Sequence, residues 1–212
     1  SMPSLSHVES PMPAARSKAA SPKTRSRGAR EKLLAAAGEL FYKHGVNAVG
    51  IDRVIAKAGV AKMSLYHHFD SKDDLVAAWL QEKHTAWMAW LVDRVERVPV
   101  NDRPSELFAA MDEWFHTPDF KGCAFINAAA EAKDPRSKTF RICTAHTSDL
   151  HDAIKGWIAA AHPALGADAL ARAAQDITMI VAGAITWAWM HGPDGVAERA
   201  RQSAELVIRA AK

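Results

Sequence analysis

The sequence has few of the features that mark secreted, membrane-spanning or disulfide-stabilised proteins. Its 212 residues include two cysteines, Cys123 and Cys143, which are too few for a disulfide framework. No apolar signal segment opens the chain. Its most apolar run, residues 177–190, is shorter than the roughly 18–20 residues that span a bilayer. We therefore expect a cytoplasmic protein that does not enter a membrane.

Sequence motifs of enzymes are also missing. There is no HExxH sequence, no glycine-rich phosphate loop and no nucleophile elbow. His146, Asp149 and His151 are titratable neighbours, but their spacing does not place all three on one helical face. We expect no catalytic residue and no cofactor, and we keep an enzyme that uses a helical pocket only as a remote alternative.

The spacing of potential metal ligands matches no standard zinc pattern, so we expect no metal site. The candidate ligands would be Cys123, Glu131, Cys143 and His146. A thiol- or metal-responsive regulator is the alternative to a regulator that responds to an organic molecule. The simpler interpretation of the two cysteines is a pair of buried, unreactive thiols.

Period-two alternation is absent over any length typical of a strand, whereas apolar residues recur with helical spacing along most of the chain. The pattern predicts an all-α protein of about nine helices. Glycine and proline residues separate most of them. The expected helices cover residues 26–44, 51–58, 61–67, 72–98, 105–116, 124–132, 137–161, 167–190 and 194–211.

Charge is distributed unevenly along the chain. Residues 1–75 carry 12 Lys and Arg against 7 Asp and Glu, whereas the remainder carries 15 against 17. This asymmetry favours a polyanionic partner at the N-terminal end. We predict a disordered basic tail over residues 1–24, a DNA-binding helix-turn-helix domain over 25–72 and a ligand-binding and dimerisation domain over 73–212.

The segment 51–67 meets the requirements of a helix-turn-helix, in which a first helix supports a second that enters the major groove of DNA. Gly59 provides the turn between the two expected helices, and Leu65 is expected to anchor the second one in a core. Hydrogen-bonding side chains occupy the outer positions of the second helix and the residue that follows it: Lys62, Ser64, Tyr66, His67 and His68.

The stretch AGVAKMSLYHHFDSKDDL, residues 58–75, resembles the signature of the tetracycline-repressor (TetR) family of bacterial transcription regulators. The resemblance extends back through EKLLAAAGELFYKHGVNAVGIDRVIAK and is strong over about residues 28–80. Many members have Thr or Ser where this chain has Val49 and Gly50, and many have Gly where it has Met63. The resemblance implies DNA contacts by Lys62, Met63, Ser64, Tyr66, His67, His68 and Lys72.

The remaining residues are rich in tryptophan, since all seven Trp residues lie beyond residue 78. Large aromatic side chains form cores and also line ligand cavities. We predict a pocket for a mostly apolar organic effector, while core packing is the alternative for each residue and a solvent-facing or ion-paired carboxylate is the alternative for Glu131. The expected lining is Trp87, Trp90, Met111, Trp114, Phe115, Phe125, Asn127, Glu131, Cys143, His146 and Trp187.

The run at 177–190 is apolar on all sides, so a helix there needs cover from its own core and from a second copy. We predict a homodimer through the helices at 167–190 and 194–211. By analogy with the TetR family, the expected function is a repressor. It would bind a pseudo-palindromic double-stranded DNA operator and be released by the effector.

Overall fold

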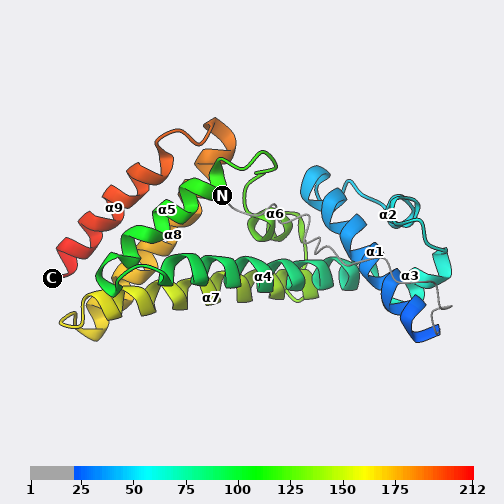
Figure 1. The fold of residues 1–212 in the computed structure, drawn as a ribbon, viewed down its shortest axis with the longest axis horizontal. Helices are drawn as coiled ribbons and strands as arrows, with labels where there is room; N and C mark the ends of the chain where they lie inside the picture. The colour runs from blue at the N-terminus through cyan, green and yellow to red at the C-terminus, as the bar shows by residue number, and fades with distance from the viewer. Residues whose placement is uncertain (1–21) are drawn as a thin grey trace, which may run out of the picture. The chain divides into compact units, whose positions relative to one another are not determined.

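The computed structural model describes residues 22–212, with side chains from residue 28 onward. This part of the chain consists of helices joined by turns and irregular segments, without a strand. The helices are α1 (Pro22–His44), α2 (Ile51–Ala58), α3 (Lys62–His68), α4 (Lys72–Glu96), a 3-10 turn η1 (Val100–Asp102), α5 (Arg103–Phe115), α6 (Ala124–Glu131), α7 (Lys138–Ala161), α8 (Ala167–His191) and α9 (Val196–Ala211). Figure 1 shows their order along the chain. The predicted all-α class is confirmed.

Two compact units divide the described residues. One comprises residues 22–83 and 124–143, and the other comprises residues 84–123 and 144–212. The helices α4 and α7 each contribute residues to both units.

The first unit is built around α1, α2 and α3, which pack against one another. Its core is apolar: Leu33, Leu34, Leu40, Phe41, Val54, Leu65 and Phe69 are all buried. Trp79 of α4 also belongs to it, because its ring lies 5.7 Å from that of Phe41 and its indole lies against Gly38. A side chain at position 38 would collide with that indole, which explains a glycine inside α1.

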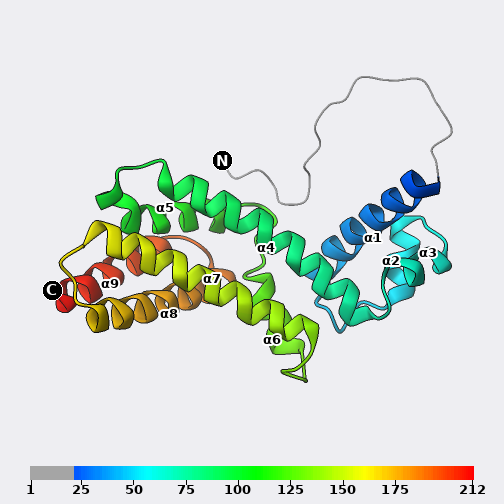
Figure 2. The ribbon, with the colours of Figure 1, turned by 90° about the horizontal axis from the view of Figure 1, so that it is seen from below.

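The second unit contains α5, α8 and α9. The last two helices pack side by side, and α5 packs on both (Figure 2). Small residues permit this close packing: Ala173, Ala174, Ala184 and Ala188 of α8, and Ala197, Ala200 and Ala204 of α9, are buried. Within one chain, the run at 177–190 is covered on only part of its surface. Met179, Trp187 and Met190 are 58%, 59% and 68% exposed.

Many predicted helix boundaries differ from the structure by one or two residues, and the largest difference is at the start of the first helix. The first helix begins at Pro22, inside the expected tail, because proline suits the first turn of a helix, where its missing N–H is not needed. The rest of that tail lies outside the described residues. The compact unit around α1–α3 also extends past the expected end at residue 72, since it includes residues 73–83 and 124–143.

Candidate nucleic-acid interface

The turn between α2 and α3 is made by Gly59, whose φ of 63° lies in the left-handed region that favours glycine. Its N–H donates to the carbonyl oxygens of Ile55 and Ala56 at 3.0 and 3.3 Å, which closes the last turn of α2. After Val60 and Ala61 the chain enters α3, and Leu65 on this short helix is 0% exposed. The buried Leu65 anchors α3 and determines which of its faces points outward.

Six of the seven side chains that were predicted to contact DNA lie on α3, and Lys72 lies at the start of α4. Met63 is 76% exposed and Tyr66 is 46% exposed. Lys62 and His67 are also exposed, whereas Ser64, His68 and Lys72 are half-buried. A short helix with a buried leucine on one side and hydrogen-bonding groups on the other has the form that a major-groove reader requires.

Lys62 has a partner within the protein, because its Nζ lies 3.1 Å from Asp52 Oδ1. The hydrogen bond to Asp52 raises the pKa of Lys62, so the ammonium stays charged at neutral pH. Both side chains are largely exposed, and such pairs are weak. The ammonium can therefore exchange Asp52 for a phosphate oxygen at small energetic cost.

The start of α4 is stabilised by a reciprocal cap. The Asp74 N–H donates to Ser71 Oγ at 3.1 Å, and the Ser71 hydroxyl donates to the Asp74 carboxylate at 2.8 Å. Lys72 is the first residue of this helix, where backbone N–H groups point outward and favour anions. Ser71 therefore caps the N-terminus of α4.

Asp73 forms contacts with the start of α7 that sequence reasoning missed. Its carboxylate accepts hydrogen bonds from the backbone N–H groups of Lys138 and Thr139 at 2.9 and 3.2 Å, and so caps α7. The Thr139 hydroxyl donates to the same carboxylate, and Lys138 Nζ pairs with Asp74. No local pattern predicts a cap that comes from a helix 65 positions earlier in the chain.

Glu131, which was predicted to line the ligand pocket, instead binds the turn that follows α1. Its carboxylate accepts from the backbone N–H groups of Val46 and Asn47 at 3.0 and 2.6 Å. The Asn47 amide returns a hydrogen bond to the Glu131 carbonyl oxygen at 3.2 Å. Gly45 has φ of 86°, and a Cβ there would lie 2.9 Å from the carboxylate. We call the contacts of Glu131 and Asp73 together the α6–α7 clasp.

In the other unit, aromatic side chains gather around Trp87. Its ring lies 5.4 Å from that of Trp114, 6.2 Å from that of Trp90 and 5.3 Å from the imidazole of His146. The Trp87 indole N–H is buried and has no hydrogen-bond partner among the described residues. Such an unsatisfied donor is unusual in a folded interior.

His146 is buried in this cluster, and burial together with the neighbouring His84 lowers its pKa to about 3. The Nδ1 atoms of the two rings lie 3.0 Å apart, and His84 Nε2 lies 3.0 Å from Asp149 Oδ2. Sequence reasoning missed His84, which lies between His146 and Asp149. His151 instead contacts Thr178 Oγ1, so the titratable residues near 146–151 do not form one site.

Some of the other residues that were predicted to line the pocket are buried, and others are exposed to solvent. Met111, Phe115, Phe125 and Cys143 are buried like Trp87, Trp114 and His146, whereas Trp90 is half-buried. Asn127 is exposed, and Trp187 is 59% exposed with its ring 4.3 Å from that of His191. Trp187 therefore lies on the surface of the described chain rather than on a cavity wall, because it is on the outer stripe of α8.

Both cysteines are buried. No group of three or more His, Cys, Asp or Glu side chains in the described part of the chain is arranged to hold a metal ion. Between residues 22 and 212, none of the helices combines the length and the apolar character that crossing a bilayer requires.

Comparisons with known proteins agree with this geometry. The family model described as bacterial regulatory proteins, tetR family, matches residues 33–79. The structure is similar to that of a TetR-family transcriptional regulator from Streptomyces coelicolor, with 30% identity, a TM-score of 0.78 and coverage of 87% of this chain and 96% of that one. The reduced form of NemR from Escherichia coli has the same fold, with a TM-score of 0.75 at 19% identity over 84% of this chain and 95% of that one.

Curated relatives align over shorter segments. The transcriptional activator FasR of Mycolicibacterium smegmatis is 38% identical over 86 residues, which are 41% of this chain and 38% of FasR. The repressor NemR of Escherichia coli is 27% identical over 108 residues, which are 50% of this chain and 54% of NemR. The chain thus spans between about a third and about half of the length of these relatives. The N-terminal match, together with similarity over nearly the whole Streptomyces structure, shows that the chain belongs to the TetR family of bacterial transcriptional regulators.

Proposed function

We propose that this protein is a transcriptional repressor that binds a pseudo-palindromic operator as a homodimer and is released by a mostly apolar organic effector. The observation that carries the proposal is the outer face of α3, where Lys62, Met63, Tyr66 and His67 are exposed while Leu65 is fully buried. We assign the DNA contacts to Lys62, Met63, Ser64, Tyr66, His67, His68 and Lys72.

The exposed side of α8 supports the homodimer. Met179, Gly183, Trp187 and Met190 lie along one stripe of this helix and are all exposed. On α9, Leu206 is 60% exposed. Large apolar side chains grouped in this way mark interaction surfaces. We infer that a second copy of the chain covers this surface. A two-fold symmetric dimer would present two α3 helices, which match the two half-sites of a pseudo-palindromic operator.

The aromatic cluster around Trp87 supports a mostly apolar effector. Trp87, Trp114 and His146 are 3%, 6% and 3% exposed, so a ligand among them would be almost fully desolvated. The unpaired Trp87 indole N–H offers a hydrogen bond to an acceptor atom of that ligand. We retain Trp87, Trp90, Met111, Trp114, Phe115 and His146 as the effector contacts within this unit.

Two features suggest how the effector acts on DNA affinity. Trp87 and Lys72 lie on the same uninterrupted helix, α4, so a change at the cluster can move the start of that helix. The α6–α7 clasp fastens Glu131 and the start of α7 to the DNA-binding unit. A coupling free energy of about 1–3 kcal/mol would change operator affinity about 5- to 150-fold.

The experiment that tests the proposal is selection of bound duplexes from a random pool, followed by titration of the selected sequence at several salt concentrations. Lys62→Ala is expected to weaken binding about tenfold and to reduce the slope of log affinity against log salt by about 1, as for a lost phosphate contact. Lys57→Ala is the matched control, since Lys57 lies on α2 and pairs with Glu39.

Failure to enrich any sequence would contradict the proposal, and so would equal losses in the Lys62 and Lys57 variants. A reporter gene placed behind the selected operator then decides the direction of regulation. Reduced expression supports the proposed repressor, whereas increased expression would show an activator.

A further inference from the structure

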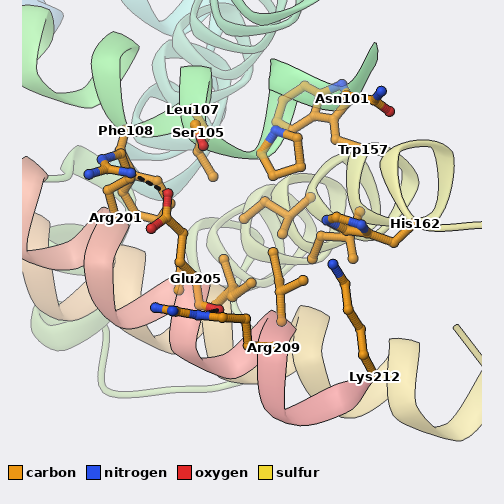
Figure 3. Close-up of a pocket in the computed structure, with 16 residues that line it drawn as sticks. Asn101, Ser105, Leu107, Phe108, Trp157, His162, Arg201, Glu205, Arg209 and Lys212 are labelled. Carbon is orange, nitrogen blue, oxygen red and sulfur yellow. Dashed lines mark hydrogen bonds and ion pairs between the residues drawn. The ribbon is translucent and has the colours of Figure 1, made fainter.

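A cavity lies away from the aromatic cluster, in the unit formed by residues 84–123 and 144–212. It has a volume of about 340 Å³ and opens between the η1–α5 segment, the end of α7 and the C-terminal half of α9 (Figure 3). Small-molecule sites have volumes of about 300–1,000 Å³, so this cavity is large enough for a small organic ligand. It shares no lining residue with the cluster around Trp87.

The inner wall of the cavity is apolar. Every large side chain in it is at most 7% exposed: Leu107, Phe108, Ile154, Trp157, Ile158, Ile177 and Ile208. The Trp157 indole N–H donates to Glu96 at 3.1 Å, so even this polar atom of the wall is satisfied elsewhere. An occupant would therefore meet mainly hydrocarbon in the interior of the cavity.

The mouth of the cavity carries an excess of positive charge. Its one acidic side chain, Glu205, is paired with Arg201, which also binds Glu198. Arg209 and Lys212 lie at the same mouth, and neither has a carboxylate within ion-pair distance among the described side chains. In Figure 3 the Lys212 side chain points toward His162.

Neutral hydrogen-bonding groups complete the mouth. Burial and the nearby Lys212 charge lower the pKa of His162, so this imidazole is neutral at physiological pH. Asn101 and Ser105 add an amide and a hydroxyl from the η1–α5 segment. The mouth thus combines two cations with neutral hydrogen-bonding groups, above an interior lined by apolar side chains.

We propose that this cavity binds an organic monocarboxylate with an unbranched or aromatic apolar body. The carboxylate would be held by Arg209 and Lys212, whose charge-assisted hydrogen bonds suit it, and the apolar body would lie against the inner wall. A cation would be repelled at the mouth, and a second charged group on the body would be desolvated in the interior. The proposal does not rest on DNA binding.

The test is calorimetric titration of the full-length protein with sodium octanoate, with octanol and octyltrimethylammonium as uncharged and cationic counterparts. Octanoate is expected to bind saturably with one site per chain. The double variant Arg209→Ala/Lys212→Ala is expected to bind it about tenfold more weakly, because two charge-assisted contacts are lost. Arg199→Ala is the matched control, since Arg199 is an exposed arginine on α9 that does not line the cavity.

A second variant keeps the test informative. Ser105 is half-buried and lines the mouth, so Ser105→Phe places a ring there without removing any buried apolar contact. This variant is expected to abolish octanoate binding while its circular dichroism spectrum remains unchanged. The proposal is overturned if octanoate does not saturate a site at millimolar concentration. It is also overturned if octanol binds equally well, or if the double variant and Ser105→Phe both bind like the unmodified protein.

Discussion

Individual side chains here act mostly through partners that are distant in the sequence. Burial lowers the pKa of His146, because its imidazole lies against the rings of Trp87 and His84 with almost no access to water. In the folded protein it stays neutral at every pH at which the protein is ordinarily handled. In the unfolded chain it takes up a proton near its ordinary pKa of about 6.5.

This difference predicts a pH dependence of stability. Because folding lowers the pKa of His146 to about 3, the unfolded state binds more protons below pH of about 6.5. Stability is therefore fully present above that pH and is lost progressively as the pH falls toward 3. At pH 5.5 the loss is about 1.4 kcal/mol. The free energy of unfolding, measured with urea at pH 7.5 and 5.5, tests this loss. The His146→Phe variant is expected to lose less of its unfolding free energy between these two pH values. An equal loss in both proteins would contradict this assignment.

Glu131 gives a second prediction at this scale. Glu131→Ala leaves the N–H groups of Val46 and Asn47 without their carboxylate acceptor, and it is expected to destabilise the protein by about 1–2 kcal/mol in urea. Glu82→Ala is the control, because Glu82 forms only an exposed ion pair with Arg30 at 3.5 Å. Its cost is expected to stay below about 0.5 kcal/mol. Similar losses in the two variants would show that the clasp does not stabilise the turn.

At the scale of the helices, the residues that begin and end each helix position α3 as much as the buried faces do. Gly59 ends α2 in a left-handed conformation, and Ser71 and Asp74 begin α4 with a reciprocal cap. Between these two points lies α3, which is too short to be stable alone and depends on Leu65 and on the helices at its sides. The orientation of the DNA-contacting side chains therefore depends on the packing of this segment.

Replacing the cap tests that dependence. Ser71→Ala removes the acceptor of the Asp74 N–H and is expected to cost about 1 kcal/mol of stability. Ser71→Asp retains an acceptor and is expected to recover most of the loss. Thermal unfolding of the three proteins provides the measurement. If the aspartate variant is as unstable as the alanine variant, the hydroxyl has a role other than capping.

At the scale of the whole molecule, the exposed stripe of α8 predicts the oligomeric state. Met179→Glu places a charge on that stripe, and it is expected to convert the dimer to a monomer in light scattering after size exclusion. Met63→Glu is the matched control, because Met63 is 76% exposed on α3, outside the proposed interface. A stable dimer in both variants, or a monomer before any substitution, would contradict the proposed assembly.

The sequence by itself determined the helical class, the turn at Gly59, the buried Leu65 and the outward set on α3. Each of these follows from spacing along a few turns of chain, where local geometry decides which residues share a face. The boundaries of α2 were predicted to the residue, because glycines flank it on both sides.

Only the tertiary structure decided the partners of the polar groups. Glu131 was predicted to face a ligand and instead holds the turn after α1, and Asp73 caps α7 from another helix. The cavity bordered by Arg209 and Lys212 likewise joins segments more than 100 positions apart. A helical pattern specifies which side of a helix is apolar, but it leaves open which helix covers it. Buried and half-buried polar groups take their partners from that packing.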